Sequence, residues 1–128
     1  MKMKILLAED DPHISLIMQL CLEKMGGHTV QVFEDGESAL NAALKDTYDL
    51  ILLDGMMPKR SGLQVAQELR KSGSHKSIPI IFLSAKSEDK DVSLFLSYGT
   101  GYIAKPFDPQ SICARIDEIM RKPEAQAR

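Results

Sequence analysis

The stretch Met3-Lys4-Ile5-Leu6-Leu7-Ala8-Glu9-Asp10-Asp11 contains a short, almost continuous apolar run that ends abruptly in three acidic residues. A run that is apolar throughout, rather than alternating, is typical of a strand buried in the centre of a parallel sheet. Pro12 follows, and proline is favoured in the first turn of a helix. The stretch therefore predicts a central strand over Met3–Ala8 and a helix directly after it. The inward-facing positions of this helix are predicted to be Ile14, Ile17, Met18, Cys21 and Met25.

Four further apolar runs alternate with amphipathic segments along the rest of the chain. They predict strands over His28–Phe33, Leu50–Leu53, Pro79–Leu83 and Tyr102–Ala104. Helices are predicted from Asp35, with Ala39, Ala42, Ala43 and Leu44 inward, from Gly62, with Leu63, Val65, Ala66 and Leu69 inward, over Asp89–Ser97, and from about Asp108. This alternation indicates an α/β fold, here a doubly wound, five-stranded parallel sheet with five helices.

Length and composition indicate one domain, because 128 residues suit a single compact unit. We expect the domain over residues 1–122 and a flexible tail over residues 123–128, and the chain is expected to stand alone. A net charge of -2 calls for neither a nucleic acid nor an anionic membrane as a partner. The apolar runs are too short to span a bilayer, and Cys21 and Cys113 are expected to be reduced. We therefore predict a cytoplasmic location.

Polar side chains stand at the ends of four predicted strands. These residues are Glu9 and Asp10, Asp54, Ser84 and Lys105. Open parallel sheets bind ligands at the carboxyl ends of their strands, where the strand order reverses. If the order is 2-1-3-4-5, as in flavodoxin-like folds, the three carboxylates converge in one crevice. Ser84 and Lys105 would then lie on its far rim.

Three carboxylates in one crevice repel one another unless a cation lies between them. Oxygen ligands and an incomplete ligand shell favour a hydrated Mg²⁺ ion, which also binds phosphate groups. Lys105 adds a positive charge that suits a phosphate oxygen. Asp54 is therefore a candidate nucleophile on phosphorus, with the metal and the lysine screening the charge that builds during transfer.

The motifs at these strand ends are Glu9-Asp10-Asp11, Asp54-Gly55-Met56-Met57-Pro58 with Gly62, Ser84-Ala85 and Tyr102-Ile103-Ala104-Lys105-Pro106-Phe107. Together they resemble the signatures of receiver domains of bacterial response regulators, the CheY-like proteins of two-component signalling. The resemblance covers the whole chain up to the tail.

The resemblance implies that Asp54 is the phosphoacceptor and takes a phosphoryl group from a sensor histidine kinase or a histidine phosphotransfer protein. Asp10 and Asp54 would bind Mg²⁺ directly, Glu9 through a water molecule, and Met56 through its backbone carbonyl. Asp11 is expected to cap the helix that starts at Pro12 rather than to bind the metal.

The resemblance also implies a switch. Lys105 and the hydroxyl of Ser84 would hold the phosphoryl oxygens. As Ser84 moves toward the phosphoryl group, the ring of Tyr102 would turn inward and reshape the face formed by the fourth helix, fifth strand and fifth helix, which a downstream effector protein would bind. Such a protein is not a turnover enzyme: its chemistry is limited to autophosphorylation and self-dephosphorylation.

Residues 97–101 depart from the family pattern, and the segment from Ser84 to Lys105 is about one residue short. We therefore expect an irregular end to the fourth helix. The acidic residues that many transcription-factor receivers use to dimerise are absent, although Arg115 matches a basic position used there, so we expect a monomer or a weak dimer. Met56 and Lys86 occupy positions that tune the loss of phosphate in the family.

Two other classes remain open from the residues alone. A phosphatase of the haloacid dehalogenase type needs a second acid two residues after its aspartate nucleophile, where this chain has Met56. A flavodoxin-like mononucleotide binder needs a loop rich in serine, threonine and glycine after the first strand. The acidic stretch Glu9–Asp11 would repel the phosphate of that nucleotide.

Overall fold

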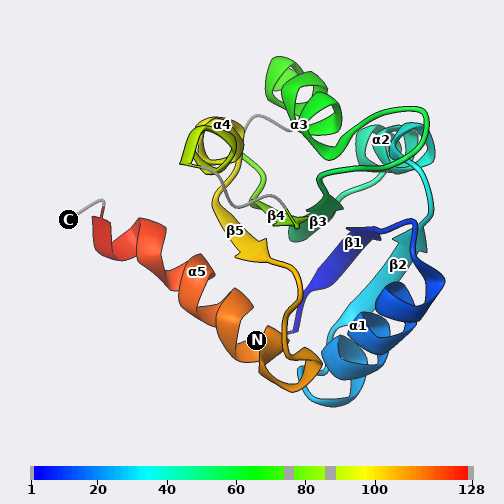
Figure 1. The fold of residues 1–128 in the computed structure, drawn as a ribbon, viewed down its shortest axis with the longest axis vertical. Helices are drawn as coiled ribbons and strands as arrows, with labels where there is room; N and C mark the ends of the chain where they lie inside the picture. Colours follow the sequence, from blue (N-terminus) through cyan, green and yellow to red (C-terminus); the bar gives the residue numbers. More distant parts are fainter. Residues whose placement is uncertain (1, 74–76, 86–88, 127–128) are drawn as a thin grey trace.

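The computed structural model describes residues 2–73, 77–85 and 89–126 and contains a five-stranded parallel sheet in the order β2-β1-β3-β4-β5 (Figure 1). The strands are β1 (Lys4–Ala8), β2 (Thr29–Phe33), β3 (Leu50–Asp54), β4 (Ile80–Ser84) and β5 (Gly101–Ala104). The helices are α1 (Pro12–Lys24), α2 (Gly36–Lys45), α3 (Gly62–Lys71), α4 (Asp89–Tyr98) and α5 (Ile112–Gln126), with a short 3₁₀ helix, η2 (Pro109–Ser111), before the last. The predicted fold class and strand order are confirmed.

Helices cover both faces of the sheet, and each face has its own apolar core (Figure 1). On one face, α1 and α5 bury Met18, Leu22, Ile112 and Ile116 against the sheet. On the other face, α2, α3 and α4 bury residues such as Leu40, Leu69 and Phe95. Because the strands are covered on both sides, β1, β3 and β4 are apolar along their length.

The strand register brings the predicted site residues to one edge. β1 lies between β2 and β3. The next strand in sequence, β2, lies on one side of β1, and the later strands β3 to β5 lie on the other side, so the strand order reverses at β1. Ala8 pairs with Leu53, Asp54 with Leu83, and Ser84 with Ala104. The residues that end or directly follow β1, β3, β4 and β5 therefore meet at the carboxyl edge of the sheet.

The helix starts follow from capping. Asp11 caps α1, and its Oδ1 accepts hydrogen bonds from the backbone N–H groups of His13 and Ile14 at 2.9 and 3.4 Å. Asp35 caps α2, as predicted, by accepting from the N–H of Ser38. Asp11 thus takes the capping role that the sequence favoured.

Two predicted inward positions of α1 are wrong. Ile17 is 44% exposed, Met25 is 59% exposed and lies beyond the helix as its C-cap, whereas Leu22 is fully buried. A helical period centred on Met18 puts the small polar Ser15 and Leu22 on the same face, and the apolar pattern alone gave no sign of Ser15. Leu44 of α2 is likewise 44% exposed, because Leu40 takes its place in the core.

The connection between α4 and β5 is compact. The N–H of Gly99 bonds to the carbonyl of Phe95 at 2.7 Å, and the N–H of Thr100 bonds to that of Ile80 at 2.6 Å. A Cβ atom at Gly99 would lie 2.6 Å from the ring of Phe82, and one at Gly101 would overlap Ile119. The short connection therefore fits because two glycines let the backbone approach the core closely. The hydrogen bond from Gly99 to Phe95 continues the regular helical pattern, so the irregular end expected for this helix stays a prediction.

The C-terminal helix extends further than predicted. α5 continues through Gln126, beyond the boundary placed at Lys122, so four residues of the predicted tail are helical. The division into residues 1–122 and 123–128 stays a prediction. Lys86 and residues 127–128 lie outside the described residues.

Two further features are local. The Lys105–Pro106 bond is cis. Cys21 and Cys113 are both free and partly buried, and the thiol of Cys113 donates to the carbonyl of Cys21 at 3.6 Å. Among the described residues, the structure contains no helix with the length and apolar character needed to cross a membrane.

Candidate functional site

Three carboxylates meet at the carboxyl edge of the sheet. Glu9 and Asp10 follow β1, Asp54 ends β3, and one carboxylate oxygen from each lies within 4.8 Å of the other two. Glu9 and Asp54 are buried, with 1% and 5% of their surface exposed, whereas Asp10 is exposed. The structure thus brings together the acids that the sequence placed at two separate strand ends.

Lys105 reaches into this cluster from the end of β5. Its Nζ lies 2.7 Å from Oε1 of Glu9 and 3.2 Å from Oδ2 of Asp54. The remaining oxygens of the two acids are held by the backbone: Oε2 of Glu9 accepts from the N–H of Asp11 at 3.1 Å, and Oδ1 of Asp54 from the N–H of Met56 at 3.2 Å. Each buried carboxylate therefore has one oxygen fixed by the chain and one turned toward the lysine.

Burial and the neighbouring acid set the electrostatics. Burial raises the pKa of Asp54, and the nearby carboxyl of Glu9 raises it further, while the N–H of Met56 and the charge of Lys105 oppose the rise. Burial would lower the pKa of Lys105, but Glu9 and Asp54 together outweigh it and raise that pKa. One ammonium does not fully compensate the acids of this crevice, so the site favours a further cation.

Two glycines let the segment after β3 pack closely around the site. A side chain at Gly62 would collide with the backbone carbonyl of Asp54. A Cβ atom at Gly55 would lie 3.1 Å from Oγ of Ser84, so the hydroxyl of Ser84 stands directly beside the residue that follows Asp54. Glycine at these two positions therefore lets the segment pack closely against the end of β3 and against Ser84.

A family model for the response regulator receiver domain matches residues 5–117. The chain belongs to the response regulator receiver family. It is 38% identical over 122 residues to the transcriptional regulatory protein RprY of Bacteroides fragilis. The matched region covers 94% of this chain and 50% of that protein. The chain spans about half the length of the curated relatives it matches.

Solved structures agree with this assignment. The chemotaxis protein CheY4 of Vibrio cholerae superposes with a TM-score of 0.84 at 25% identity, covering 93% of this chain and 99% of that one. The receiver domain of the sensor histidine kinase PA1611 from Pseudomonas aeruginosa gives a TM-score of 0.80 at 30% identity, covering 95% of this chain and 97% of that one. That structure is described with a magnesium ion coordinated in its active-site cleft. Neither alternative class, the phosphatase or the mononucleotide binder, is the family that the chain matches.

The donor set of this receiver domain fits a hard divalent cation. All three acidic groups offer oxygen ligands, and Asp10 is exposed, so water has access to the cluster. Oε1 of Glu9 is fully buried, and within the described part of the chain it accepts no well-directed hydrogen bond, although Lys105 lies 2.7 Å away. Met56, which the sequence predicts as a ligand through its backbone carbonyl, is 65% exposed.

Ser84 and Tyr102 are linked on the next two strands of the receiver domain. The hydroxyl of Tyr102 donates to the backbone carbonyl of Ser84 at 3.2 Å. The Tyr102 ring stacks on Phe95 of α4 with 5.7 Å between centroids, and Phe95 stacks on Phe82 of β4 at 4.7 Å. The strand end that carries Ser84 is thus joined to Phe95 of α4 through the ring of Tyr102.

Arg70 makes long-range contacts that the sequence pattern does not reveal. From α3, its Nε donates to the carbonyl of Tyr98 at the end of α4, and its Nη1 to the carbonyl of Ile78 before β4, both at 2.7 Å. Burial lowers the pKa of its guanidinium. A lone arginine on an otherwise polar helix face gives no signal of a distant backbone partner, so the pattern could not reveal this bridge between α3 and α4.

Proposed function

We propose that Asp54 accepts a phosphoryl group, in a magnesium-dependent reaction, from a sensor histidine kinase or a histidine phosphotransfer protein. The observation that carries the proposal is the position of Oδ2 of Asp54, 3.2 Å from the ammonium of Lys105 and inside a cluster of three carboxylates. A carboxylate oxygen beside a fixed cation is suited to attack an electrophilic phosphorus whose oxygens need charge compensation.

Magnesium would be held by Asp10 and Asp54 directly, by Glu9 through water, and by the backbone carbonyl of Met56. When bound, it supplies positive charge for the phosphoryl oxygens. The clustering of the three carboxylates supports this ligand set, and so does the magnesium ion described in the cleft of the PA1611 receiver domain.

The protein's own groups have separate roles in the proposed transfer. Asp54 forms the new bond to phosphorus, and the backbone N–H of Met56 keeps its other oxygen in place. Lys105 and the hydroxyl of Ser84 hold phosphoryl oxygens. No residue need act as a general base, because a carboxylate is already the reactive form of the nucleophile.

The proposed output is a shift between two packings of the α4, β5 and α5 face, through Ser84 and Tyr102. Its support is the chain of contacts from Ser84 through Tyr102 to Phe95 of α4. A downstream effector protein would bind this face. We further propose a cytoplasmic phosphoacceptor switch rather than a turnover enzyme, a monomer or weak dimer, with neither nucleic acid nor membrane bound by this domain.

The direct test is incubation with phosphoramidate or acetyl phosphate and Mg²⁺, read by intact mass. We expect one phosphate adduct on the wild type, loss of the adduct with EDTA, and none in Asp54→Asn. Asp11→Asn is the matched control, because asparagine also caps a helix, and it should be labelled like the wild type. An equal adduct in Asp54→Asn would contradict the proposal.

A further inference from the structure

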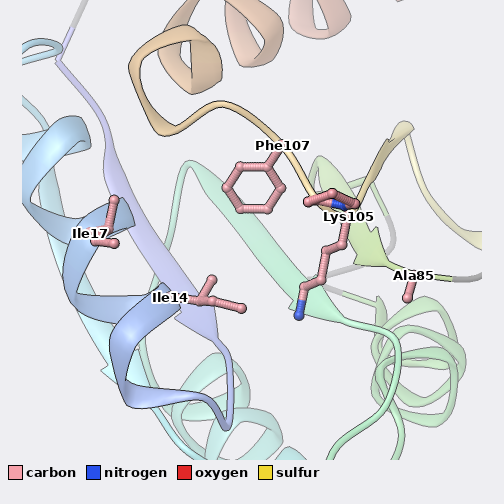
Figure 2. Close-up of a pocket in the computed structure, with 6 residues that line it drawn as sticks. Ile14, Ile17, Ala85, Lys105 and Phe107 are labelled. Atoms are coloured by element: carbon pink, nitrogen blue, oxygen red, sulfur yellow. The ribbon is translucent and has the colours of Figure 1, made fainter.

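A cavity of about 280 Å³ lies beside the carboxylate cluster (Figure 2). It is open to solvent and is bordered by α1, by Ala85 after β4 and by the segment that follows β5. Its lining residues are Ile14, Ile17, Ala85, Lys105, Pro106 and Phe107.

Lys105 belongs to both the cavity and the phosphorylation site. Its Nζ lies 3.2 Å from Oδ2 of Asp54, while the same side chain lines the cavity. In the view of Figure 2, Ile14, Ile17 and Phe107 lie on one side of Lys105 and Ala85 on the other. A molecule whose phosphoryl end is held by Lys105 therefore has the apolar cavity directly beside it.

Among the described residues, the lining is apolar apart from this lysine, and part of it faces solvent. Ile17, which the sequence predicts to face the core, is 44% exposed. Ala85 and Pro106 are also exposed. Ile14 and Phe107 pack on the core cluster from the other side. An apolar group that enters the cavity would remove this surface from water, which favours its binding.

We propose that the cavity takes the acyl chain of an acyl phosphate while Lys105 holds its phosphoryl group, so that donors with acyl chains longer than acetyl phosphorylate Asp54 faster. This inference rests on the proposed phosphoryl transfer to Asp54. The apolar lining selects a hydrocarbon chain over a sugar or a base, whose polar groups would lose their hydrogen bonds to water there.

The step needs no further reactant. A carboxylate oxygen of Asp54 forms a bond to phosphorus, the bond between phosphorus and the bridging acyl oxygen breaks, and the acyl group leaves as a carboxylate with the bonding electron pair. The chemistry of the leaving carboxylate changes little from acetate to butyrate. A dependence of rate on chain length therefore reports contacts of the chain rather than reactivity.

The experiment compares acetyl, propionyl and butyryl phosphate with phosphoramidate, which has no acyl chain, as donors to the Mg²⁺-loaded protein. Second-order rate constants for the phosphate adduct are measured by intact mass. We expect an increase of roughly two- to fourfold for each added methylene group. In Ile17→Ser the butyryl-to-acetyl ratio should fall toward one, with the phosphoramidate rate unchanged.

Leu16→Ser is the matched control, because Leu16 lies on the same helix, is 55% exposed and does not line the cavity. It should keep the wild-type ratio of butyryl to acetyl rates.

Equal rates for all acyl phosphates, or a chain-length preference that survives in Ile17→Ser, would overturn the inference. If phosphoramidate still labels the protein in that case, the proposed function stands. Failure of every donor would remove both. An Ile17→Ser variant that slows transfer only from a phosphohistidine protein would assign the cavity to a protein side chain and also overturn the inference.

Discussion

The hydroxyl of Tyr102 donates a hydrogen bond of 3.2 Å to the backbone carbonyl of Ser84 on the neighbouring strand. The bond ties a side chain facing α4 to the strand end that lies beside Asp54. Since the ring also stacks on Phe95, the hydrogen bond and the stacking contact together link Ser84 to α4.

Tyr102→Phe removes this hydrogen bond and keeps the ring. We expect a loss of about 0.5–1.5 kcal/mol in the free energy of unfolding, the usual net worth of one hydrogen bond, measured by urea unfolding. Labelling of Asp54 by phosphoramidate should continue, because Tyr102 does not contact the carboxylates in the proposed transfer. A variant that folds but accepts no phosphate would show that Tyr102 acts in the chemistry and not only in the switch.

Asp54→Asn should stabilise the metal-free protein at neutral pH by about 1 kcal/mol, a typical size for a single substitution. The pKa of Asp54 is raised in the folded state above its ordinary value of 3.8. Ionisation is therefore harder in the folded than in the unfolded chain, and the cost is present above the folded-state pKa. As the pH falls below 3.8, the acid becomes protonated in the unfolded state as well as in the folded state, so the gain should shrink toward zero. Thermal unfolding of both proteins in EDTA between pH 7 and pH 3.5 tests this, and a gain that grows toward low pH would contradict it.

Magnesium should stabilise the wild type, because an ion that binds only the folded state shifts unfolding by mass action. At a Mg²⁺ concentration ten times the Kd the gain is about 1.4 kcal/mol. Asp10→Asn should reduce this gain, since Asp10 is a proposed direct ligand. Asp11→Asn should retain it, because Asp11 caps α1. Equal Mg²⁺ titrations of the two variants, followed by melting temperature, would rule out the ligand assignment.

Much of the fold follows from short-range patterns. The buried strands are continuous apolar runs, and their ends carry the acids, the serine and the lysine, so alternation and topology suffice to bring these residues to one edge. Asp11 and Asp35 likewise predict the starts of α1 and α2, since an aspartate cap needs only the backbone N–H groups of the next three residues.

The rest depends on contacts that the sequence does not encode locally. The apolar pattern predicts the wrong rotation of α1 at Ile17, because Ser15 is buried but gives no apolar signal. The bridge from Arg70 to Tyr98 joins residues 28 positions apart through a backbone carbonyl, which any residue offers. The two backbone N–H groups that orient the carboxylates depend on the path of the chain after β1 and β3, which residue identity does not fix.

Arg70→Met should loosen α4 from α3. It removes the hydrogen bonds of 2.7 Å to the carbonyls of Tyr98 and Ile78. The free energy of unfolding should fall by about 1–3 kcal/mol, because the donor is charged and the acceptors are partly buried. Amide hydrogen exchange should accelerate at Gly99 and Thr100. Lys71→Met is the control: Lys71 is the next residue and its side chain is 74% exposed, so little change is expected. Similar losses in both variants would show that the α3 surface, and not the Arg70 bridge, sets the effect.

Gly99→Ala tests why the connection between α4 and β5 can be short. The added Cβ atom would lie 2.6 Å from the ring of Phe82, which stacks on Phe95 and is fully buried. Because the ring is part of the buried core, we expect overpacking to lower the free energy of unfolding by about 1–3 kcal/mol. Since Phe95 also carries the Tyr102 ring, the near-ultraviolet circular dichroism of the tyrosines should change as well. Gly73→Ala provides the matched comparison, because a Cβ atom there meets none of the described residues within 4 Å and the glycine has no left-handed backbone. If Gly99→Ala unfolds at the same urea concentration as Gly73→Ala, the close approach to Phe82 is not what requires glycine at the end of α4.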